Sequence, residues 1–373
     1  MFGCIAHCFD LLCEDLVKIP EFDNLVKQAK MIVRFVKGRK YVLSYLKKLI
    51  GNMGRSLVLF PDTRFACADL MVGRVLHNKT HLKEMVDNSA RWSKSKKGID
   101  DNLCRVFEEE VVDDNFMYKL QLMHNVLRPI TSATHHIESC GARASWVLPL
   151  CMACWKAINE WSTDKAVQRE FLEATRKKVV DKFKAGWLGS GNLQVGLKKD
   201  AHILAFFLDP FTTPTLGEAR QLPGWEESCR TALLQFYKDC ELNKAMSKLN
   251  NVLLRVGNWG ETIKQKQALL VVSEEEEASF KNDVDRIIFM QKRMAKLEVV
   301  SCWQVNGASQ HPHLAPVAVK LAVVAVQSAD VERVCKAHKV IHTKSRNRLL
   351  TTTVHMLLFT YVNCGCCESA HKR

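Results

Sequence analysis

The sequence predicts a mostly α-helical protein with a small α/β part. Apolar residues recur at spacings of three and four in many segments, which is the pattern of helices that bury one face. Only one short run, "LVLF" at residues 57–60, predicts a strand. The 373 residues are 47% hydrophobic and 25% charged, which is ordinary for one large or two average globular domains.

The first 95 residues are expected to be helical around that single strand. Phe22, Leu25, Ala29, Ile32, Val33 and Val36 lie on one face of a helix, and Pro20 marks its first turn. "GNMGRS" at 51–56 predicts a loop before the strand, and a further helix is expected over residues 66–86.

Residues 100–295 predict helices interrupted by three loops. The loops are "GSGN" (189–192), "DPFTTPTLGE" (209–218) and "LPGW" (222–225). "SEEEE" at 273–277 has the form of a Ser N-cap followed by acids in the first helical turn. We interpret it as a solvated helix start.

The C-terminal segment predicts two helices joined by a basic stretch. Ser328 can cap the first helix, with Asp330 and Glu332 near its positive end. The basic stretch "HTKSRNR" follows. An apolar stripe then marks the last helix, and it could pack within the chain or against a second copy. The stripe consists of Leu350, Val354, Leu357 and Tyr361.

The net charge of +14 is carried by the two ends of the chain. Residues 1–100 hold 18 Lys and Arg against 10 Asp and Glu, and residues 300–373 hold 9 against 3. The middle, 101–299, is balanced at 27 against 27. If the ends pack together they form one basic surface, which favours polyanions through counterion release. The alternative is a basic protein without such a partner.

Fifteen scattered Cys, without a signal-peptide pattern, predict an intracellular protein with reduced thiols. The longest apolar run, around 314–326, contains Lys320 and is too short for a membrane span, so no membrane partner is expected. Cys4-x-x-His7 could supply half of a zinc site, and Cys151-x-x-Cys154 is a second pair. The alternative for both pairs is buried thiols.

Two further patterns have a structural and a functional interpretation. In "DTRF", Arg64 could grip a phosphate while Phe65 stacks on an unpaired base, or the segment could be a helix cap with a core Phe. Glu332 could bind a metal ion, but two-metal phosphoryl transfer needs several converging acids. The alternative for Glu332 is a favourable first-turn acid.

Three stretches together resemble the hAT-type DNA transposases and genes domesticated from them. The first is "CIAHCFDLLCEDLVKIPEF" with "AKMIVRFV", and the second is "LFPDTRFACADLMVGRVLHNKTHLKEMV". The third is the C-terminal dimerisation block, from Trp303 through "HPHLAPVAVKLAVVAVQSADVERVCKAHKVIHTKSRNRL" to Asn363. "AHILAFFLDP" at 201–210 also fits the family.

The resemblance implies a truncated ribonuclease-H-like core interrupted by a large helical insertion. The partial core would be residues 1–95, the insertion 96–299, the dimerisation region that completes the core 300–363, and a tail 364–373. Glu332 would be the last acid of an Asp-Asp-Glu triad. Nucleic acid would be contacted by Arg64, Phe65, Arg333, Lys344, Arg346 and Arg348, and Trp303 would join the apolar stripe in dimerisation.

The sequence departs from the family at its catalytic centre. The family's two catalytic Asp lie upstream of the Cys-x-x-His block, which here begins at Cys4, so this sequence lacks them. The usual Phe-Ser after Glu-Arg is replaced by Cys335-Lys336. One acid of three does not form the metal site, so no cofactor and no DNA cleavage are expected of the chain as written.

The expected function is therefore dimerisation and nucleic-acid binding in the nucleus or elsewhere inside the cell. The first alternative is a fragment of an active transposase that uses Mg²⁺ or Mn²⁺ and whose two Asp lie in a longer form. The second is a helical interaction scaffold with no role at DNA. Steep loss of binding with rising salt would distinguish the first expectation from the scaffold.

Overall fold

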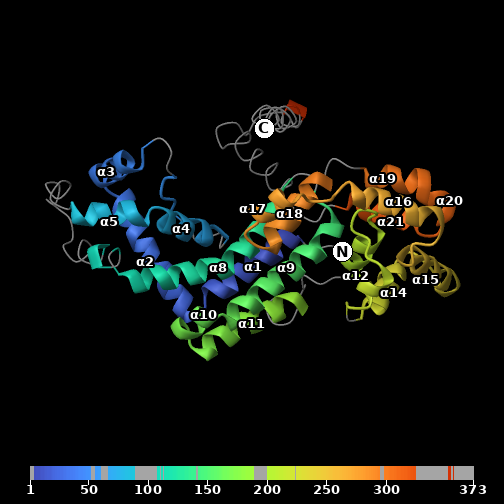
Figure 1. Cartoon of the computed structure of the whole chain (residues 1–373), viewed down its shortest axis with the longest axis horizontal. Coiled ribbons are helices and arrows are strands. Elements are labelled where there is room, and N and C mark those ends of the chain that lie inside the picture. The colour runs from blue at the N-terminus through green and yellow to red at the C-terminus, as the bar shows by residue number, and fades with distance from the viewer. Residues whose placement is uncertain are drawn as a thin grey trace.

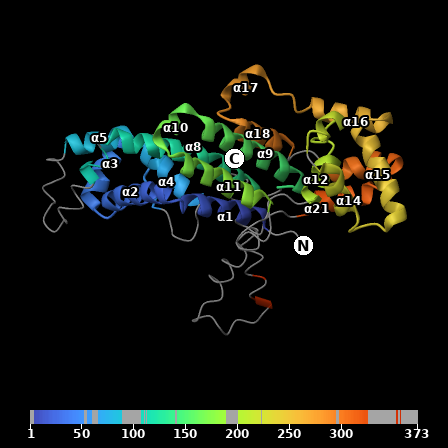
Figure 2. The same cartoon turned by 90° about the horizontal axis from the view of Figure 1, so that it is seen from below.

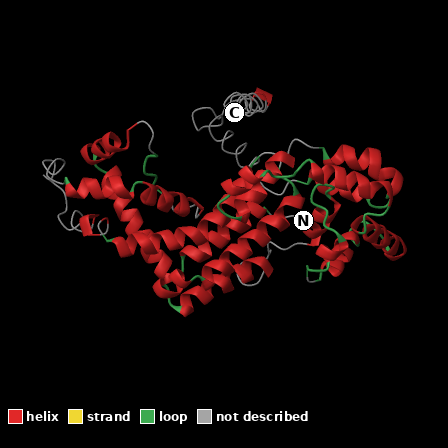
Figure 3. Ribbon diagram, viewed as in Figure 1, coloured by secondary structure: helices red, strands yellow, loops and turns green. Residues whose placement is uncertain are grey.

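The computed structural model is built from helices, and the part of the chain that it describes contains no strand (Figures 1 and 3). The description covers residues 4–51, 55–59, 66–88, 107–109, 111, 113–139, 142–188, 200–222, 224–294, 298–324, 352–353 and 356. The prediction of a mostly α-helical protein is confirmed. The molecule is elongated, with residues 20–50 and 66–87 toward one end and residues 225–268 and 299–323 toward the other (Figures 1 and 2).

Five helices make up the N-terminal part. They are α1 (Ile5–Val17), α2 (Pro20–Lys37), α3 (Lys40–Ile50), α4 (Ala66–His77) and α5 (Lys79–Asp87). Helix α2 begins at Pro20, as predicted, because the fixed φ of Pro suits a first turn and its missing N–H is not needed there. All six residues of its predicted apolar face are buried.

The centre of the molecule is a bundle around two long helices. It contains α8 (Asp114–Ile137), α9 (Ala144–Thr163), α10 (Lys165–Glu170) and α11 (Glu173–Leu188). Helix α1 packs on α8, so the first helix of the chain is part of this bundle. Trp161 joins α9 to α8, since its Nε1–H donates to the Leu122 carbonyl at 2.8 Å.

Shorter helices follow α11 in the chain. They are α12 (Asp200–Leu208), α13 (Leu216–Ala219), α14 (Trp225–Leu233), α15 (Asp239–Leu253), α16 (Gly257–Ala268), α17 (Glu274–Ser279), α18 (Asp283–Met294), α19 (Val299–Cys302), the π-helix η2 (Trp303–Gly307), α20 (Ala308–Gln310) and α21 (Ala315–Val323). Most of these helices lie toward the other end of the molecule, while α17 and α18 lie beside the central bundle (Figure 1). Helix α18 packs back against α8 and α9.

Trp303 fixes η2 against this end of the core. Its side chain is fully buried, its Nε1–H donates to the Leu208 carbonyl, and its ring lies 4.5 Å from that of Trp259. A Cβ on Gly307 would lie 2.2 Å from the Trp303 ring, so only glycine fits beside it.

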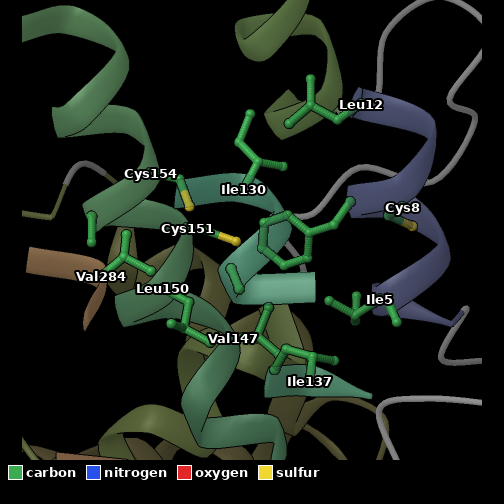
Figure 4. Close-up of a cluster of buried hydrophobic side chains, with 14 of the residues drawn as sticks. Ile5, Cys8, Leu12, Ile130, Ile137, Val147, Leu150, Cys151, Cys154 and Val284 are labelled. Atoms are coloured by element: carbon green, nitrogen blue, oxygen red, sulfur yellow. The ribbon is translucent and has the colours of Figure 1, made fainter. Parts of the chain in front are cut away.

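One hydrophobic core runs through the described residues from Ile5 to Leu321. Figure 4 shows a section where Cys8 of α1, Ile130 of α8, Cys151 and Cys154 of α9 and Val284 of α18 share one apolar cluster. The core therefore contains side chains from both sides of the predicted boundaries at 95 and 299. The division of the chain at these boundaries stays a prediction.

Two local predictions differ from the structure. The helix expected over 66–86 is divided at Asn78, whose buried amide Nδ2–H₂ donates to the carbonyls of Arg74 at 2.7 Å and Arg55 at 2.9 Å. A short polar side chain that bonds the backbone in this way competes with helix continuation. The strand expected at 57–60 is not formed over 55–59, because the described residues offer no second strand to pair with it. Leu57 is buried there without a strand.

The predicted loops at 209–218 and 222–225 are confirmed in part, because residues 216–218 belong to α13 and Trp225 already begins α14. Helix α12 ends at Leu208, and Asp209 opens a turn by accepting backbone N–H bonds from Thr212 and Thr213. Gly224, with φ of 70°, leads into α14. The loop at 189–192 lies outside the described residues.

No helix in the described part of the chain has both the length and the apolar character needed to cross a bilayer.

Candidate nucleic-acid interface

Residues 24–61 contain no Asp or Glu, and they carry nine basic residues. The basic residues are Lys27, Lys30, Arg34, Lys37, Arg39, Lys40, Lys47, Lys48 and Arg55. Most of this acid-free segment folds into the second half of α2 and all of α3. These two helices pack on each other near one end of the molecule (Figure 1).

The exposed side of the two helices forms a surface that we call the α2–α3 basic face. It consists of Arg34, Lys37, Lys40, Tyr41, Lys47 and Lys48, all exposed. Helix α3 presents it because Val42 and Leu46, one turn apart, are buried and turn the other side of the helix outward. Within the described ranges no carboxylate pairs with these five cations, so their charge is available to a polyanion.

An aromatic side chain lies within the basic face. Tyr41 is 73% exposed, so its ring is open to solvent and to a ligand. Next to it, the Arg39 guanidinium lies 4.4 Å from the Phe35 ring centroid, and its Nη1–H donates to the Phe35 carbonyl at 3.1 Å. Exposed aromatics among cations are the elements of single-strand nucleic-acid binding.

A cleft lies between α8 and α4, the helix that packs on α2. The Asn78 bond to the Arg55 carbonyl holds the chain after α3 beside the end of α4. Arg55, Arg74, Arg128 and Lys281 line this α4–α8 cleft, which has a volume of about 310 Å³. Three histidines, His77, His124 and His135, also line it.

A buried carboxylate fixes one of these histidines. The Nδ1–H of His124 donates to Oδ1 of Asp69 at 2.6 Å, and the Thr131 hydroxyl donates to Oδ2 at 2.7 Å. Asp69 is 7% exposed, so both of its oxygens are used inside the protein. Because the carboxylate holds Nδ1, the imidazole is oriented and Nε2 is its remaining nitrogen for a ligand.

The two helices run antiparallel along the cleft. Asp69 of α4 contacts His124 and Thr131, while Gly73, one turn later, faces His124 alone. A Cβ on Gly73 would lie 3.1 Å from Cε1 of His124, so glycine allows the ring to pack close to α4. Helix α5 continues in the same direction, with Lys79 and Lys83 at 2.9 and 2.7 Å from Asp114 at the start of α8.

The charges that line the cleft are unbalanced. Four cations face one carboxylate, and that carboxylate is already bonded to His124 and Thr131. Arg128 approaches Asp285 only at 3.9 Å, and the described residues give Arg55, Arg74 and Lys281 no acidic partner. The cleft is therefore suited to an anion.

Most residues predicted to contact nucleic acid or to catalyse lie outside the described residues. These are Arg64, Phe65, Glu332, Arg333, Lys344, Arg346 and Arg348, and also Leu350, Val354, Leu357 and Tyr361 of the predicted stripe. Their roles stay predictions. Arg64 and Phe65 directly precede α4, which supplies one wall of the cleft.

The structure places the other predicted residues apart from the interface. His7 is exposed on α1, Cys4 is half-buried just before that helix, and Cys8 is buried behind them. Cys151 and Cys154 are buried as expected for structural thiols. Among the described residues no three His, Cys, Asp or Glu side chains converge as metal ligands. Trp303 is fully buried, so it cannot contact a second copy directly and can affect self-association only by supporting the fold of the C-terminal block.

Sequence reasoning had not identified the basic face or the cleft. The signal for the face was available, because an acid-free run of 38 residues, 24–61, with nine cations stands out once charge is counted in short windows. No comparable signal marks the cleft, since Asp69 and His124 are 55 positions apart.

Neither protein-family models nor curated proteins match the chain.

Proposed function

We propose that this chain is a nucleic-acid-binding protein that works by binding and self-association rather than by catalysis. The α2–α3 basic face carries the proposal. It combines five exposed cations without described acidic partners, three of them on the same helix as the exposed Tyr41, so phosphate neutralisation and a ring for base stacking occur on one pair of helices. The α4–α8 cleft adds four further cations close to the same surface.

The resemblance to hAT-type transposases adds a context to this proposal, and it depends on the quoted motifs alone. In that context the chain would carry part of a ribonuclease-H-like fold, act in the nucleus and pair with a second copy through residues 300–363. Glu332 would correspond to the last acid of the family's metal-binding triad.

Salt-dependent binding tests the proposal. The triple variant Lys40→Gln, Lys47→Gln, Lys48→Gln removes three cations from the basic face. Each lost phosphate contact reduces the slope of log K against log salt by about 0.9 on duplex DNA, so the slope should fall by up to about 2.7. Fluorescence anisotropy with labelled duplex DNA, over a salt series, measures the slope.

A matched control separates a specific surface from net charge. Lys238, Lys244 and Lys248 lie in and next to α15, near the opposite end of the molecule (Figure 1). Their replacement by Gln changes the net charge equally and should leave the slope unchanged. Equal losses in both triple variants would contradict a dedicated face. If no DNA binding occurs even at low salt, the proposal fails and the scaffold alternative is favoured.

Tyr41→Ala tests the stacking role separately. We expect weaker binding of single strands by about 1–3 kcal/mol, with duplex binding nearly unchanged, because only unpaired bases offer a face to the ring. Tyr41 is 73% exposed, so its removal should leave the fold intact. An equal loss of affinity for single-stranded and duplex DNA would show that Tyr41 does not act by stacking on bases.

The self-association part has its own test. Single Asp substitutions at Leu350, Val354, Leu357 and Tyr361 place a charge in the predicted stripe, and analytical ultracentrifugation reports the oligomeric state. We expect dissociation or loss of stability. Unchanged mass and unchanged melting for all four variants would show that the stripe is not an interface.

A further inference from the structure

We propose that the α4–α8 cleft binds a terminal phosphate, the dianionic phosphomonoester at the end of a nucleic-acid strand, with His124, Arg74 and Arg128 as its contacts. The inference rests on the proposed function and names a ligand for a distinct part of the same surface.

The shape of the cleft favours an end group over a continuous backbone. Its volume of about 310 Å³ is at the small end of ligand pockets, which suits a single nucleotide. The exposed α2–α3 face, by contrast, has its cations spread along two helices, as a passing strand requires. The molecule thus offers two kinds of anion surface next to each other.

The charge in the cleft matches a dianion. An internal phosphodiester carries one negative charge, whereas a phosphomonoester carries about 1.5 to 2 at neutral pH and has three terminal oxygens. Arg55, Arg74, Arg128 and Lys281 exceed Asp69 by three charges. An additional negative charge on the ligand is therefore favoured here, and two guanidinium groups can each offer paired N–H donors.

His124 supplies a directed hydrogen bond. Its Nδ1–H is held by the buried Asp69, which in turn is fixed by the Thr131 hydroxyl, so the ring is oriented before a ligand arrives. No described side chain bonds Nε2, and the ring is one wall of the cleft. When both ring nitrogens are protonated, Nε2–H can donate to an oxygen of the dianion; when only Nδ1 is protonated, Nε2 can accept only from the O–H of a singly protonated phosphate.

Gly73 and the half-buried Arg74 lie one after the other on α4, opposite His124. Arg128 lies one turn after His124 on α8, where positions i and i+4 share a face. Arg74 and Arg128 therefore line the cleft from opposite walls. Measured along the two antiparallel helices, His124 lies between the levels of Arg74 and Arg128. A phosphate in the cleft would be contacted from two sides.

The test compares two single-stranded DNA probes of one sequence that differ only in a 5′-phosphate or a 5′-hydroxyl. Hydrogen bonds to charged groups predict roughly tenfold tighter binding of the phosphorylated strand. His124→Gln and Arg128→Gln should each remove most of this preference. Lys47→Gln with Lys48→Gln should weaken both probes by the same factor, because these residues belong to the basic face.

Isothermal titration with a nucleoside monophosphate, the matching nucleoside and inorganic phosphate identifies the source of the phosphate. Binding of the monophosphate but not the nucleoside, together with the strand-end preference, supports the proposal. Equal binding of the two DNA probes by the unmodified protein overturns it and leaves the proposed function intact. Tight binding of inorganic phosphate without any strand-end preference also overturns it.

Folding controls keep the variants interpretable. Asp69→Asn retains the shape of the carboxylate but cannot accept both bonds, so it should lower the strand-end preference while the circular dichroism spectrum is retained. Arg74→Lys keeps the charge but loses the planar fork, so it should lower the preference less than Arg74→Gln. If Arg74→Gln keeps the full preference with a normal melting temperature, Arg74 is not a contact.

Discussion

At the scale of single residues, His136 is the clearest case in which burial changes chemistry. It is buried on α8, and its ring stacks on Trp146 at 5.1 Å with an interplanar angle of 11°. Burial, opposed by a hydrogen bond with Gln291 and assisted by the charge of Lys292, lowers the pKa of His136 from 6.5 to about 4. The folded protein therefore keeps this imidazole neutral.

Stability should fall as the pH falls from about 6.5 to about 4. In this pH window His136 binds a proton in the unfolded chain but not in the folded protein. The free energy of unfolding therefore decreases by up to about 1.4 kcal/mol for each pH unit of acidification. Above the unfolded pKa the contribution is fully present. Urea denaturation at a series of pH values measures the slope.

His136→Phe should flatten this slope, because no titrating group remains at the site. Part of the slope should stay, since burial also lowers the pKa of His311. An equal slope in His136→Phe and the unmodified protein would show that His136 does not carry the effect.

At the scale of elements, a helix start that depends on hydrogen bonds between near neighbours in the chain is found where the sequence predicts it. The Ser273 hydroxyl accepts the Glu276 N–H at 3.2 Å and the Glu276 carboxylate accepts the Ser273 N–H at 3.0 Å, which completes a capping box. The predicted Ser cap at 273 is thus confirmed. Both partners lie within three residues, so no distant contact is needed.

Ser273→Ala should loosen α17 without changing global stability. Loss of a Ser cap costs about 1 kcal/mol of helix stability, and α17 has no buried residue that would transmit the loss to the core. Hydrogen exchange should therefore accelerate at residues 274–279, while the urea midpoint stays the same. The control is Ser279→Ala at the other end of α17, which should leave amide protection of the first turn unchanged. A shift of the global midpoint would contradict this assignment.

Elements that depend on distant partners were predicted less well. The break at Asn78 depends on its bond to the Arg55 carbonyl, 23 positions earlier. The apolar run at 57–59 also depends on a distant partner, because a strand must pair with a second strand. The described residues contain none, and Leu57 is buried without strand pairing. Local pattern alone could not decide either case.

At the scale of the whole molecule, the shared core should protect the thiols. Cys8, Cys13, Cys151 and Cys154 lie in the core cluster, in part shown in Figure 4. Burial raises the pKa values of Cys13, Cys151 and Cys154, so little thiolate is present for reaction. These three helix-borne thiols come from α1 and α9, which are far apart in the sequence.

Alkylation of these cysteines should require opening of the core. Among the cysteines whose burial the structure describes, we expect Cys4, which is half-buried just before α1, to be labelled first. Cys13, Cys151 and Cys154 should be labelled together at a rate that follows unfolding. Mass spectrometry of peptides after timed iodoacetamide labelling gives each rate. Fast labelling of Cys151 in native conditions would contradict a single core that joins α1 to α9.

Charge is also a property of the whole molecule. The sequence placed the positive excess at both ends of the chain, and the structure arranges the N-terminal part of it on α2, α3 and the cleft wall at Arg55. The C-terminal basic residues from Arg333 to Arg348 lie outside the described residues. Whether the two basic groups form one surface remains the prediction drawn from the sequence.

The sequence by itself determined the helical class, the apolar face of α2, the Pro20 and Ser273 helix starts and the loops near residues 209 and 224, because each depends on spacing or bonding within a few residues. Only the tertiary structure decided that α1 packs on α8, that Trp303 is a core residue and that Asp69 orients His124. These facts join positions far apart in the chain, and the free energy that selects them comes from burial and pairing that no local pattern records.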